Sequence, residues 1–272
     1  MNEHSPRPDL SPGDSGSSAA PVPDAALRTA GLSRHWGALK AVDGCDFSLG
    51  EGARHALIGP NGAGKTTLIN LLTGYLNPSA GDIYLGSERI TDLTQANRVK
   101  LGITRTFQIS NLFPGLSVIE SVVMTILERD GLGSALGKPV ARYTHQIDEA
   151  MALLSHYRLA DDCNALIRQL AYGKQRVLEI VLALATRPRI LLLDEPAAGI
   201  PVGESKEIFS SLASLPENVT VLFIEHDMNL VFRFAQRITV MASGRLLAEG
   251  TPSEIAADRR VREVYLGEEQ HD

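Results

Sequence analysis

The sequence predicts an α/β fold in which a doubly wound parallel sheet is joined by a smaller antiparallel β subdomain and an inserted helical subdomain. Residues 55–59 (HALIG), 190–195 (ILLLDE) and 219–225 (VTVLFIE) are almost continuously apolar, which is typical of strands buried on both faces of a parallel sheet. Helix-like segments separate these runs along the chain. The stretch from about residue 93 to residue 168 lacks strand-like runs and has mainly helical periodicity.

The remaining elements follow in chain order. Residues 1–26 are rich in Pro, Ser, Gly and Asp and lack the apolar core of a signal peptide, so we expect a disordered tail. Residues 27–36, 41–49 and 81–90 alternate apolar and polar side chains, which predicts the antiparallel sheet. Helices are expected over residues 65–76, 118–130, 145–159 and 175–186.

Composition narrows the function classes. The 272 residues carry a net charge of -6, which gives no overall electrostatic reason to expect nucleic acid as a partner. Two distant cysteines, Cys45 and Cys163, form neither a disulfide framework nor a zinc cluster and suit a reducing cytosol. No stretch of about 18 apolar residues is present, so we expect the chain not to cross a membrane itself.

The strongest motif is a glycine-rich loop between a predicted strand and a predicted helix. It follows the pattern G-x-x-x-x-G-K-[ST] of phosphate-binding loops. The backbone N–H groups of such a loop and the start of the helix attract phosphate oxygens, the lysine reaches the outer phosphates, and the following threonine offers an oxygen to magnesium. The predicted nucleotide-binding residues are Gly59, Pro60, Asn61, Gly62, Ala63, Gly64, Lys65, Thr66 and Thr67.

Two adjacent carboxylates end a later apolar strand. Asp194 and Glu195 follow ILLL, so both reach one edge of the predicted sheet. Asp194 is the candidate magnesium ligand together with Thr66, and Glu195 is the candidate catalytic group that orients or deprotonates a water attacking the terminal phosphate. Adjacent acids alone would indicate only a solvated strand end, and the phosphate loop argues against that interpretation.

These motifs together resemble the ATPases of ABC transporters, and residues 170–175 (LAYGKQ) occupy the place of that family's LSGGQ signature. The resemblance implies that Ala171, Gly173 and Gln175 contact the terminal phosphate of an ATP held by the opposite subunit of a dimer. The segment departs from the family pattern at three positions. Ala171 replaces serine and Tyr172 replaces glycine. Lys174 stands where glutamine is usual, and Gln175 follows it. Ala171 therefore lacks the hydroxyl with which the family's serine contacts the phosphate.

The same resemblance assigns further residues by position. Gln108 matches the Q-loop glutamine, which touches magnesium or water and acts in catalysis. His226 matches the switch histidine that contacts the terminal phosphate, and Ala198 and Gly199 match the D-loop at the dimer interface. Trp36 matches the aromatic residue that stacks on adenine, although a single tryptophan is more often part of a core.

The resemblance covers residues 27–267, leaving a short tail at 268–272, and is strongest to the ATPase subunits of branched-chain amino acid importers. It implies ATP and Mg²⁺ as cofactors and a peripheral location on the cytoplasmic face of the cell membrane. Implied partners are membrane permeases, a second ATPase subunit of the same or a related chain, and, indirectly, a periplasmic substrate-binding protein. Related ATPases serve lipopolysaccharide export, or the import of urea, amides and other amino acids.

Two other classes of protein compete with a transport ATPase. A soluble ABC ATPase acting on nucleic acid is disfavoured by the acidic balance, the single nucleotide-binding unit and the lack of a long coiled coil. A P-loop kinase or nucleotide-binding regulator would have no use for the signature, Q-loop and switch histidine in this order. The sequence therefore predicts an ATP-hydrolysing transport subunit, and it does not name the transported molecule.

Overall fold

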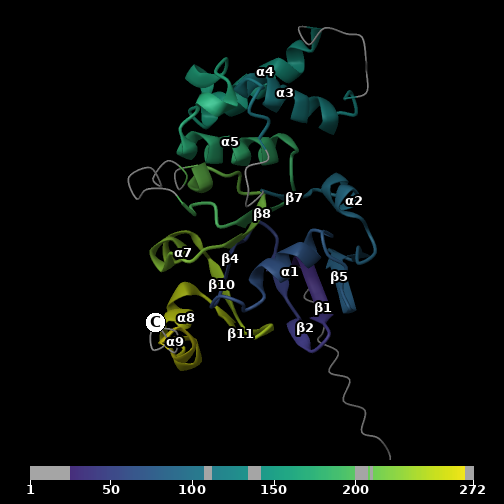
Figure 1. Cartoon of the computed structure of the whole chain (residues 1–272), viewed down its shortest axis with the longest axis vertical. Coiled ribbons are helices and arrows are strands. Elements are labelled where there is room, and N and C mark those ends of the chain that lie inside the picture. Colours follow the sequence, from purple (N-terminus) through teal and green to yellow (C-terminus); the bar gives the residue numbers. More distant parts are fainter. Residues whose placement is uncertain (1–24, 107–111, 134–141, 200–207, 209–210, 267–272) are drawn as a thin grey trace, which may run out of the picture.

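The computed structural model describes residues 25–106, 112–133, 142–199, 208 and 211–266. Within them, a six-stranded sheet has the order β11-β10-β4-β9-β8-β7. A second sheet has the order β2-β1-β5-β6, and β3 also pairs with β1. Figure 1 shows the second sheet beside the six-stranded one, with the helices α3, α4 and α5 gathered at the opposite end of the molecule. The predicted α/β fold with an antiparallel β subdomain and a helical subdomain is confirmed.

The strands of the six-stranded sheet are β4 (Arg54–Ile58), β7 (Ile103–Arg105), β8 (Ile190–Asp194), β9 (Thr220–Ile224), β10 (Arg237–Ala242) and β11 (Arg245–Gly250). Those of the second sheet are β1 (Ala25–Trp36), β2 (Leu39–Cys45), β3 (Ser48–Gly50), β5 (Ala80–Leu85) and β6 (Glu88–Arg89). The helices are α1 (Lys65–Leu72), α2 (Gln95–Lys100), α3 (Val118–Arg129), α4 (Thr144–His156), α5 (Tyr172–Ala185), α7 (Met228–Phe234), α8 (Pro252–Ala257) and α9 (Arg259–Leu266).

The parallel part of the six-stranded sheet is buried on both faces. Strands β10, β4, β9, β8 and β7 pair in parallel in that order, whereas β11 is antiparallel to β10. Every residue of β8 and β9 is buried. Successive side chains of a strand point to opposite faces, and the two faces of this sheet contribute to two different hydrophobic cores. The predicted strands at 55–59, 190–195 and 219–225 are therefore confirmed as parts of one parallel sheet.

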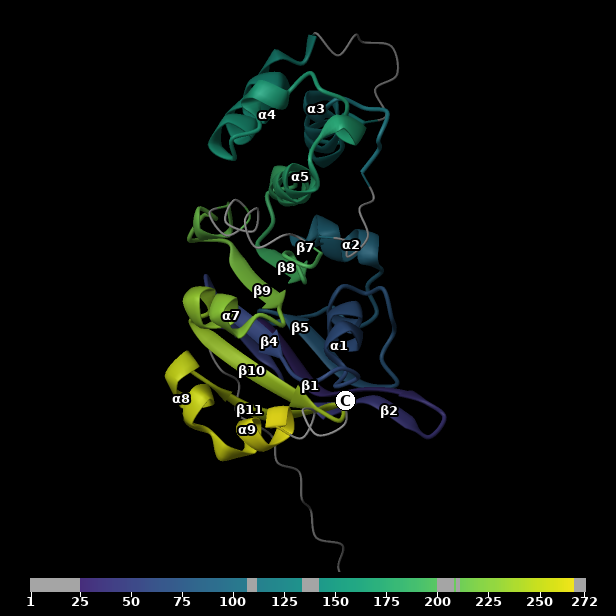
Figure 2. The ribbon, with the colours of Figure 1, turned by 60° about the vertical axis from the view of Figure 1, so that its left-hand side comes forward.

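The first core lies between the six-stranded sheet, α1 and the antiparallel sheet. It contains Leu57, Leu192 and Leu222 together with Leu68 of α1 and Leu27 of β1. Because α1 packs here, the loop that precedes it is fixed against the carboxyl end of β4. Figure 2 shows α1 and α7 on opposite sides of the sheet strands.

The second core covers the other face and continues into the helical subdomain. It contains Ala56, Leu191 and Val221 of the sheet, with Val181 of α5 and Val122 of α3. Within that subdomain, Arg129 of α3 forms an ion pair with Glu149 of α4 and donates a hydrogen bond to the carbonyl oxygen of Ala185 at the end of α5. These contacts join the three helices to one another.

Three predicted boundaries require correction. Strand β1 begins at Ala25, inside the predicted tail of residues 1–26, because Ala25 pairs with Gly50 of β3. The predicted helical range 93–168 includes β7, which pairs in parallel with β8 and so belongs to the core sheet. The first predicted helix, 65–76, is shorter and ends at Leu72. Residues 1–24 and 268–272, predicted to be tails, lie outside the described residues.

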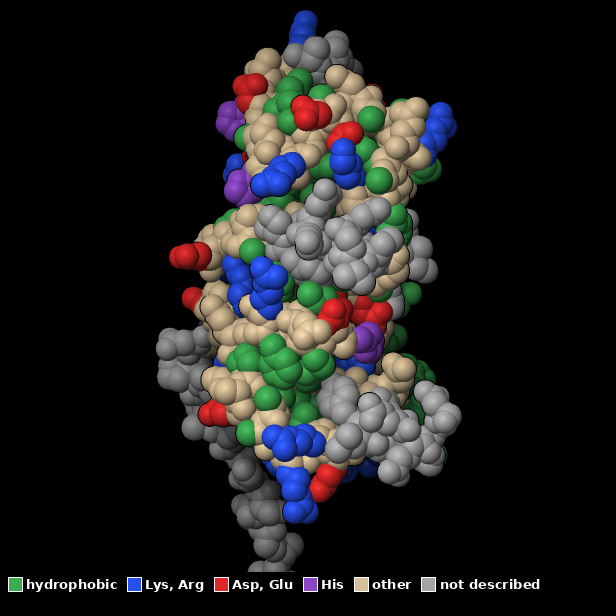
Figure 3. Space-filling view, turned by 90° about the vertical axis from the view of Figure 1, so that its left-hand side faces the viewer, with side chains coloured by type: hydrophobic (Ala, Val, Ile, Leu, Met, Phe, Trp, Pro, Cys, Tyr) green, Lys and Arg blue, Asp and Glu red, His purple; other side chains and the backbone are tan. Residues whose placement is uncertain are grey.

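The surface on the side drawn in Figure 3 has mixed charge. Lysine and arginine side chains are interspersed with acidic ones over the described part of this face. Among the described residues, none of the helices is long and apolar enough to span a lipid bilayer.

Candidate functional site

Three chain segments leave the parallel sheet at the same edge. Leu57 of β4 and Asp194 of β8 are both paired with Ile224 of β9, so the ends of the three strands lie level. The glycine-rich loop follows β4, Glu195 follows β8, and His226 follows β9 by two residues. The fold therefore brings the phosphate loop, the acidic pair and the predicted switch histidine to one edge.

The phosphate loop needs glycine at two positions. Gly59 and Gly64 have φ angles of +148° and +102°, a backbone region that residues with a side chain rarely adopt. An added Cβ would lie 2.1 Å from the carbonyl oxygen of Met241 at Gly59 and 2.1 Å from that of Ala41 at Gly64. Neighbouring backbone therefore packs closely against both ends of the loop and leaves no room for a side chain. Gly64 is also the N-cap of α1.

Lys65 is the first residue of α1, and its side chain is held against the loop. Its ammonium group donates to the carbonyl oxygens of Gly59 at 2.6 Å and Pro60 at 2.8 Å, and the residue is buried. The other predicted loop residues surround it: Asn61, Gly62 and Thr66 are exposed, Thr67 is half-buried, and Ala63 is buried. The loop therefore places a cation and the start of a helix at one point, as phosphate binding requires.

Asp194 is buried at the end of β8, and its side chain has no exposed surface. Its Oδ2 accepts a hydrogen bond from Nη2 of Arg105 at 2.5 Å. Its Oδ1 has no hydrogen-bond partner among the residues that the structure describes. A buried carboxylate oxygen without a partner is costly, and Oδ1 fits a ligand atom for a divalent cation.

Glu195 and His226 contact each other directly. His226 Nε2 lies 2.6 Å from Glu195 Oε1, and the Glu195 backbone has φ of +49°. Glu225 supports the same region because its carboxylate accepts hydrogen bonds from the backbone N–H groups of Ala197 and His226. Burial raises the pKa of Glu225 above its usual value.

The signature segment begins α5. Ala171 is the N-cap and provides no side-chain hydrogen bond to the helix start, so the first backbone N–H groups of α5 lack the usual cap. Gly173 is buried, and the Gln175 side chain donates to the Leu170 carbonyl oxygen at 3.0 Å. Tyr172 accepts hydrogen bonds from Arg176 through its hydroxyl.

The signature segment and the phosphate loop of this chain are separated. Figures 1 and 2 both show α5 and α1 on opposite sides of β7 and β8. The D-loop position Gly199 is close to the signature instead, since a Cβ built on it would lie 3.8 Å from the Tyr172 hydroxyl. The two predicted dimer-interface segments are thus neighbours within one chain, and the phosphate loop lies elsewhere.

Trp36 ends β1 and is 43% exposed. The Arg34 guanidinium carbon lies 4.9 Å from the centroid of the indole ring, within the range of a cation–π contact. Arg34 is itself fixed by a 3.0 Å hydrogen bond to the Asn77 carbonyl oxygen. An exposed aromatic ring held from one side is suited to stacking on a planar base.

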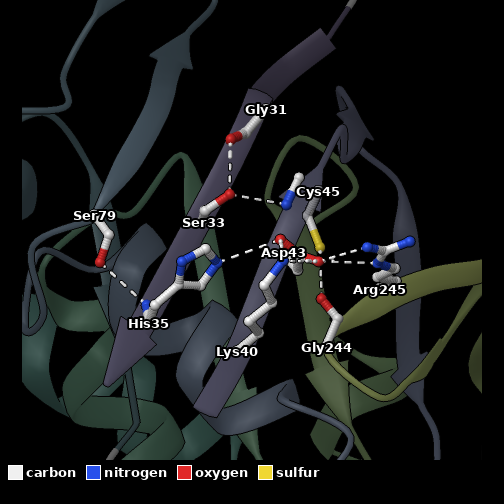
Figure 4. Close-up of polar contacts among 10 residues, drawn as sticks. Gly31, Ser33, His35, Lys40, Asp43, Cys45, Ser79, Gly244 and Arg245 are labelled. Atoms are coloured by element: carbon white, nitrogen blue, oxygen red, sulfur yellow. Dashed lines mark hydrogen bonds and ion pairs between the residues drawn. The ribbon is translucent and has the colours of Figure 1, made fainter. Parts of the chain in front are cut away.

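Asp43 of β2 connects this region to the β10–β11 hairpin, as Figure 4 shows. Its carboxylate lies 3.3 Å from Nε2 of His35, 3.3 Å from Nζ of Lys40 and 2.7 Å from Nη2 of Arg245. The Arg245 hydrogen bonds are the main cause of a lowered pKa of Asp43. Asp43 and Arg245 could not be predicted from the sequence, because no motif joins residues 202 positions apart.

Gly244 of that hairpin is hydrogen-bonded to the phosphate loop. Its N–H donates to the Ala63 carbonyl oxygen at 3.0 Å, and its own carbonyl oxygen accepts from the N–H of Asp43 and from Sγ of Cys45. Arg105 and Glu225 were also missed, although Glu225 directly precedes His226 and Arg105 lies three positions before Gln108 in sequence. The predicted Gln108 lies outside the described residues.

Comparisons with known families agree with this arrangement. A family model described as "ABC transporter" matches residues 42–198. A second one, described as "Branched-chain amino acid ATP-binding cassette transporter", matches residues 245–271. The first covers more than half of the chain.

Similar curated proteins share nearly the whole length. LivG of Salmonella typhimurium, a high-affinity branched-chain amino acid transport ATP-binding protein, is 41% identical over 249 residues, covering 89% of this chain and 98% of that protein. BraF of Pseudomonas aeruginosa, with the same description, is 39% identical over 251 residues, with 89% and 98% covered. These relatives do not favour the lipopolysaccharide-export alternative.

Solved structures give the same family. The ADP conformation of MJ1267, an ATP-binding cassette of an ABC transporter, matches with a TM-score of 0.79 and 30% identity, covering 89% of this chain and 99% of that one. The dimeric structure of MJ0796, a bacterial ABC transporter cassette, has a TM-score of 0.70 at 24% identity and covers 83% and 98%, which shows the shared fold. The predicted resemblance is confirmed: the chain belongs to the ABC transporter family and is one of its ATP-binding ATPase cassettes.

Proposed function

We propose that the chain is the MgATP-hydrolysing subunit of an importer for branched-chain or closely related amino acids. The observation that carries the catalytic part is the 2.6 Å contact between Glu195 and His226, at the sheet edge where the phosphate loop also begins. A carboxylate and an imidazole in contact can hold an attacking water and the proton it releases. The names of the relatives LivG and BraF support the transported class.

ATP would be held along this edge. The backbone N–H groups of residues 59–67 and the ammonium of Lys65 bind the phosphates, and Trp36 stacks on adenine. Glu195 orients the water and accepts its proton, and His226 positions Glu195 and reaches the terminal phosphate. Apart from the backbone N–H groups, each of these roles uses a side chain at the start of α1, just after β8 or β9, or at the end of β1.

Magnesium fits the residues present. The unpartnered Oδ1 of Asp194 is the supporting observation, and oxygen ligands are those that Mg²⁺ prefers. Asp194, Thr66 and Gln108 would hold the ion. When bound, it neutralises charge on the phosphate oxygens.

A second ATPase subunit would complete the site. The uncapped N–H groups at the start of α5 can bind an anion, and they lie on the far side of the sheet from this chain's own phosphate loop. We therefore assign Ala171, Gly173 and Gln175 to the ATP of a partner subunit, which is the same chain or a related one. Ala171 offers no hydroxyl, so the backbone N–H groups carry this contact.

The remaining partners follow from the proposed transport role. Permease subunits in the membrane would dock beside Gln108, with the cassette on the cytoplasmic face and a substrate-binding protein on the other side. The test is co-expression of the chain with permease and binding-protein genes, followed by ATP-dependent uptake of leucine, isoleucine and valine into vesicles. Uptake that depends on Glu195 supports the proposal. An active ATPase that co-purifies with a permease but moves none of the three amino acids contradicts the substrate class.

A further inference from the structure

Arg105 ends β7 and joins three elements of the core. Its Nη2 donates to Asp194 Oδ2 of β8 at 2.5 Å, and its Nη1 donates to the side-chain oxygen of Asn70 in α1. The Arg105 side chain is 14% exposed and that of Asp194 is fully buried. One guanidinium therefore links β7, β8 and the helix that follows the phosphate loop.

The two carboxylate oxygens of Asp194 have different surroundings. Oδ2 is held by Arg105, and Oδ1 is buried without a hydrogen-bond partner among the described residues. A buried carboxylate that lacks a counter-ion is strongly disfavoured. Arg105 supplies that counter-ion and fixes the orientation of the carboxylate.

A divalent cation at Oδ1 would share one carboxylate with Arg105. Two positive charges a few Å apart repel each other, and burial reduces the screening of that repulsion. Arginine carries a fixed positive charge, so only movement of the Arg105 side chain can relieve the repulsion. The hydrogen bond from Arg105 to Asn70 opposes movement of the guanidinium away from Asp194.

We propose that Arg105 is the resident counter-ion of Asp194 and competes with magnesium for it, so that Arg105 sets the magnesium concentration at which the nucleotide site fills. The inference rests on the proposed function, in which Asp194 is a magnesium ligand. Arg105 acts through Asp194 and is a positioning residue. Removing the charge of Arg105 should tighten metal binding and lower the stability of the metal-free protein.

The test uses Mn²⁺ as the probe. Binding of Mn²⁺ to the ATP complex of the full chain is followed by electron paramagnetic resonance, in a Glu195→Gln background that slows hydrolysis. Arg105→Met keeps an apolar stem and removes the charge, and we expect it to lower the Mn²⁺ dissociation constant by about 10-fold. It should also lower the melting temperature without metal, and added Mn²⁺ with ATP should restore more of that loss than in the parent.

Two further variants separate charge from shape. Arg105→Lys keeps the charge but presents a single ammonium that cannot reproduce the fork between Asn70 and Asp194, so its Mn²⁺ affinity should stay within about 2-fold of the parent. The matched control is Arg237→Met, which removes an arginine paired with Glu249 on the surface. It should change neither metal affinity nor the recovery of stability by metal.

Unchanged or weaker Mn²⁺ binding in Arg105→Met would overturn the proposal. If that variant does not fold, Arg105→Gln provides the same charge removal with a polar side chain and is judged by the same criterion. Asp194→Asn distinguishes this failure from failure of the proposed function. If Asp194→Asn leaves Mn²⁺ affinity unchanged, Asp194 is not the metal ligand and both ideas fail; if it weakens affinity while Arg105→Met has no effect, only the counter-ion role fails.

Discussion

The Nε2 atom of His226 lies 2.6 Å from the Oε1 atom of Glu195. The two residues follow neighbouring strands, and Glu195 adopts a φ of +49° that costs a non-glycine residue about 1 kcal/mol or more. Its backbone N–H is held by the carbonyl oxygen of Ile224 at 3.1 Å. The surrounding sheet thus holds the glutamate in the conformation that meets the histidine.

Glu195→Gln should separate binding from hydrolysis. Glutamine keeps the size and polarity of the side chain but cannot accept a proton, so we expect ATP binding to persist while phosphate release falls by about 100-fold or more. Phosphate release and fluorescent-nucleotide titration measure the two effects. Glu51→Gln, an exposed glutamate 3.7 Å from Arg189, is the control. Normal turnover in Glu195→Gln would remove Glu195 from the catalytic role.

Lys65→Ala should weaken ATP binding. It deletes a charged donor aimed at the phosphates, and hydrogen bonds to charged groups contribute about 1.5–3 kcal/mol, so we expect a roughly 10- to 150-fold rise in the dissociation constant. Lys100→Ala removes an exposed lysine from α2 and should leave affinity unchanged. Equal affinities in a calorimetric titration of both variants would count against the phosphate-loop assignment.

Ala171→Ser should have two separable effects. As the N-cap of α5, a serine should add about 1 kcal/mol to the stability of the nucleotide-free protein, or about 2–4 °C in melting temperature. A hydroxyl bond to the partner's phosphate should also strengthen ATP-dependent association by about 10- to 150-fold. Light scattering in a Glu195→Gln background measures the association.

Gly173→Asp tests the same segment in the opposite direction. It adds bulk and negative charge at a buried glycine where the partner's phosphate would bind, so association should be lost. The nucleotide-free melting temperature reports any general loss of folding. If association responds to neither Ala171→Ser nor Gly173→Asp, residues 170–175 are only the start of a helix.

Gly64→Ala should be severely destabilising. Its Cβ would lie 2.1 Å from the Ala41 carbonyl oxygen, so the loop or β2 must shift, and we expect a loss of about 3 kcal/mol or more in unfolding free energy. Gly115→Ala is the matched control, because no atom lies within 4 Å of its added Cβ. It should change stability by less than about 0.5 kcal/mol. Urea unfolding of both variants provides the comparison, and similar midpoints would contradict the close approach.

His55 should make stability depend on pH. It is buried in β4, with Nε2 2.7 Å from the Thr239 hydroxyl oxygen, and burial lowers its pKa from 6.5 to about 4. Below pH 6.5 the unfolded chain takes up a proton that the folded protein resists, so stability is lost as the pH falls toward 4. The loss reaches about 3 kcal/mol.

The variant His55→Phe tests this directly. It removes the titrating ring and should flatten the unfolding free energy between pH 6.5 and 4, even if it lowers stability throughout. His145→Gln, at an exposed histidine of α4, should keep the slope of the parent. An unchanged slope in His55→Phe would show that other groups cause the pH dependence.

Local pattern was sufficient to predict most of the fold and to propose the motif residues of the site. Continuous apolar runs identified β4, β8 and β9 because burial on both faces leaves a strong signal in few residues. Strand β7 was missed because three residues are too short to show a period, and it becomes a strand only through pairing with β8.

The supporting contacts of the site could not be predicted for a related reason. Arg105 and Asp194 are 89 positions apart, and Arg245 and Asp43 are 202 apart. Single-sequence patterns report periodicity and neighbours, and they contain no record of such pairings. The sequence therefore predicts which residues carry the chemistry, but it does not predict which residues contact them and hold them in place.

Helix α5 connects the signature segment at its start to the helical subdomain and β8 at its end. Its first residues form the signature segment, while its last turn is tied by Arg129 to α3 and α4 and leads to β8. From Gly173 to Ala185 the helix spans roughly 18 Å, so a rotation of about 10° around its end near β8 would move Gly173 by about 3 Å. In the proposed dimer, a small tilt of the helical subdomain would then be enough to make or break a hydrogen bond to the phosphate of the partner subunit.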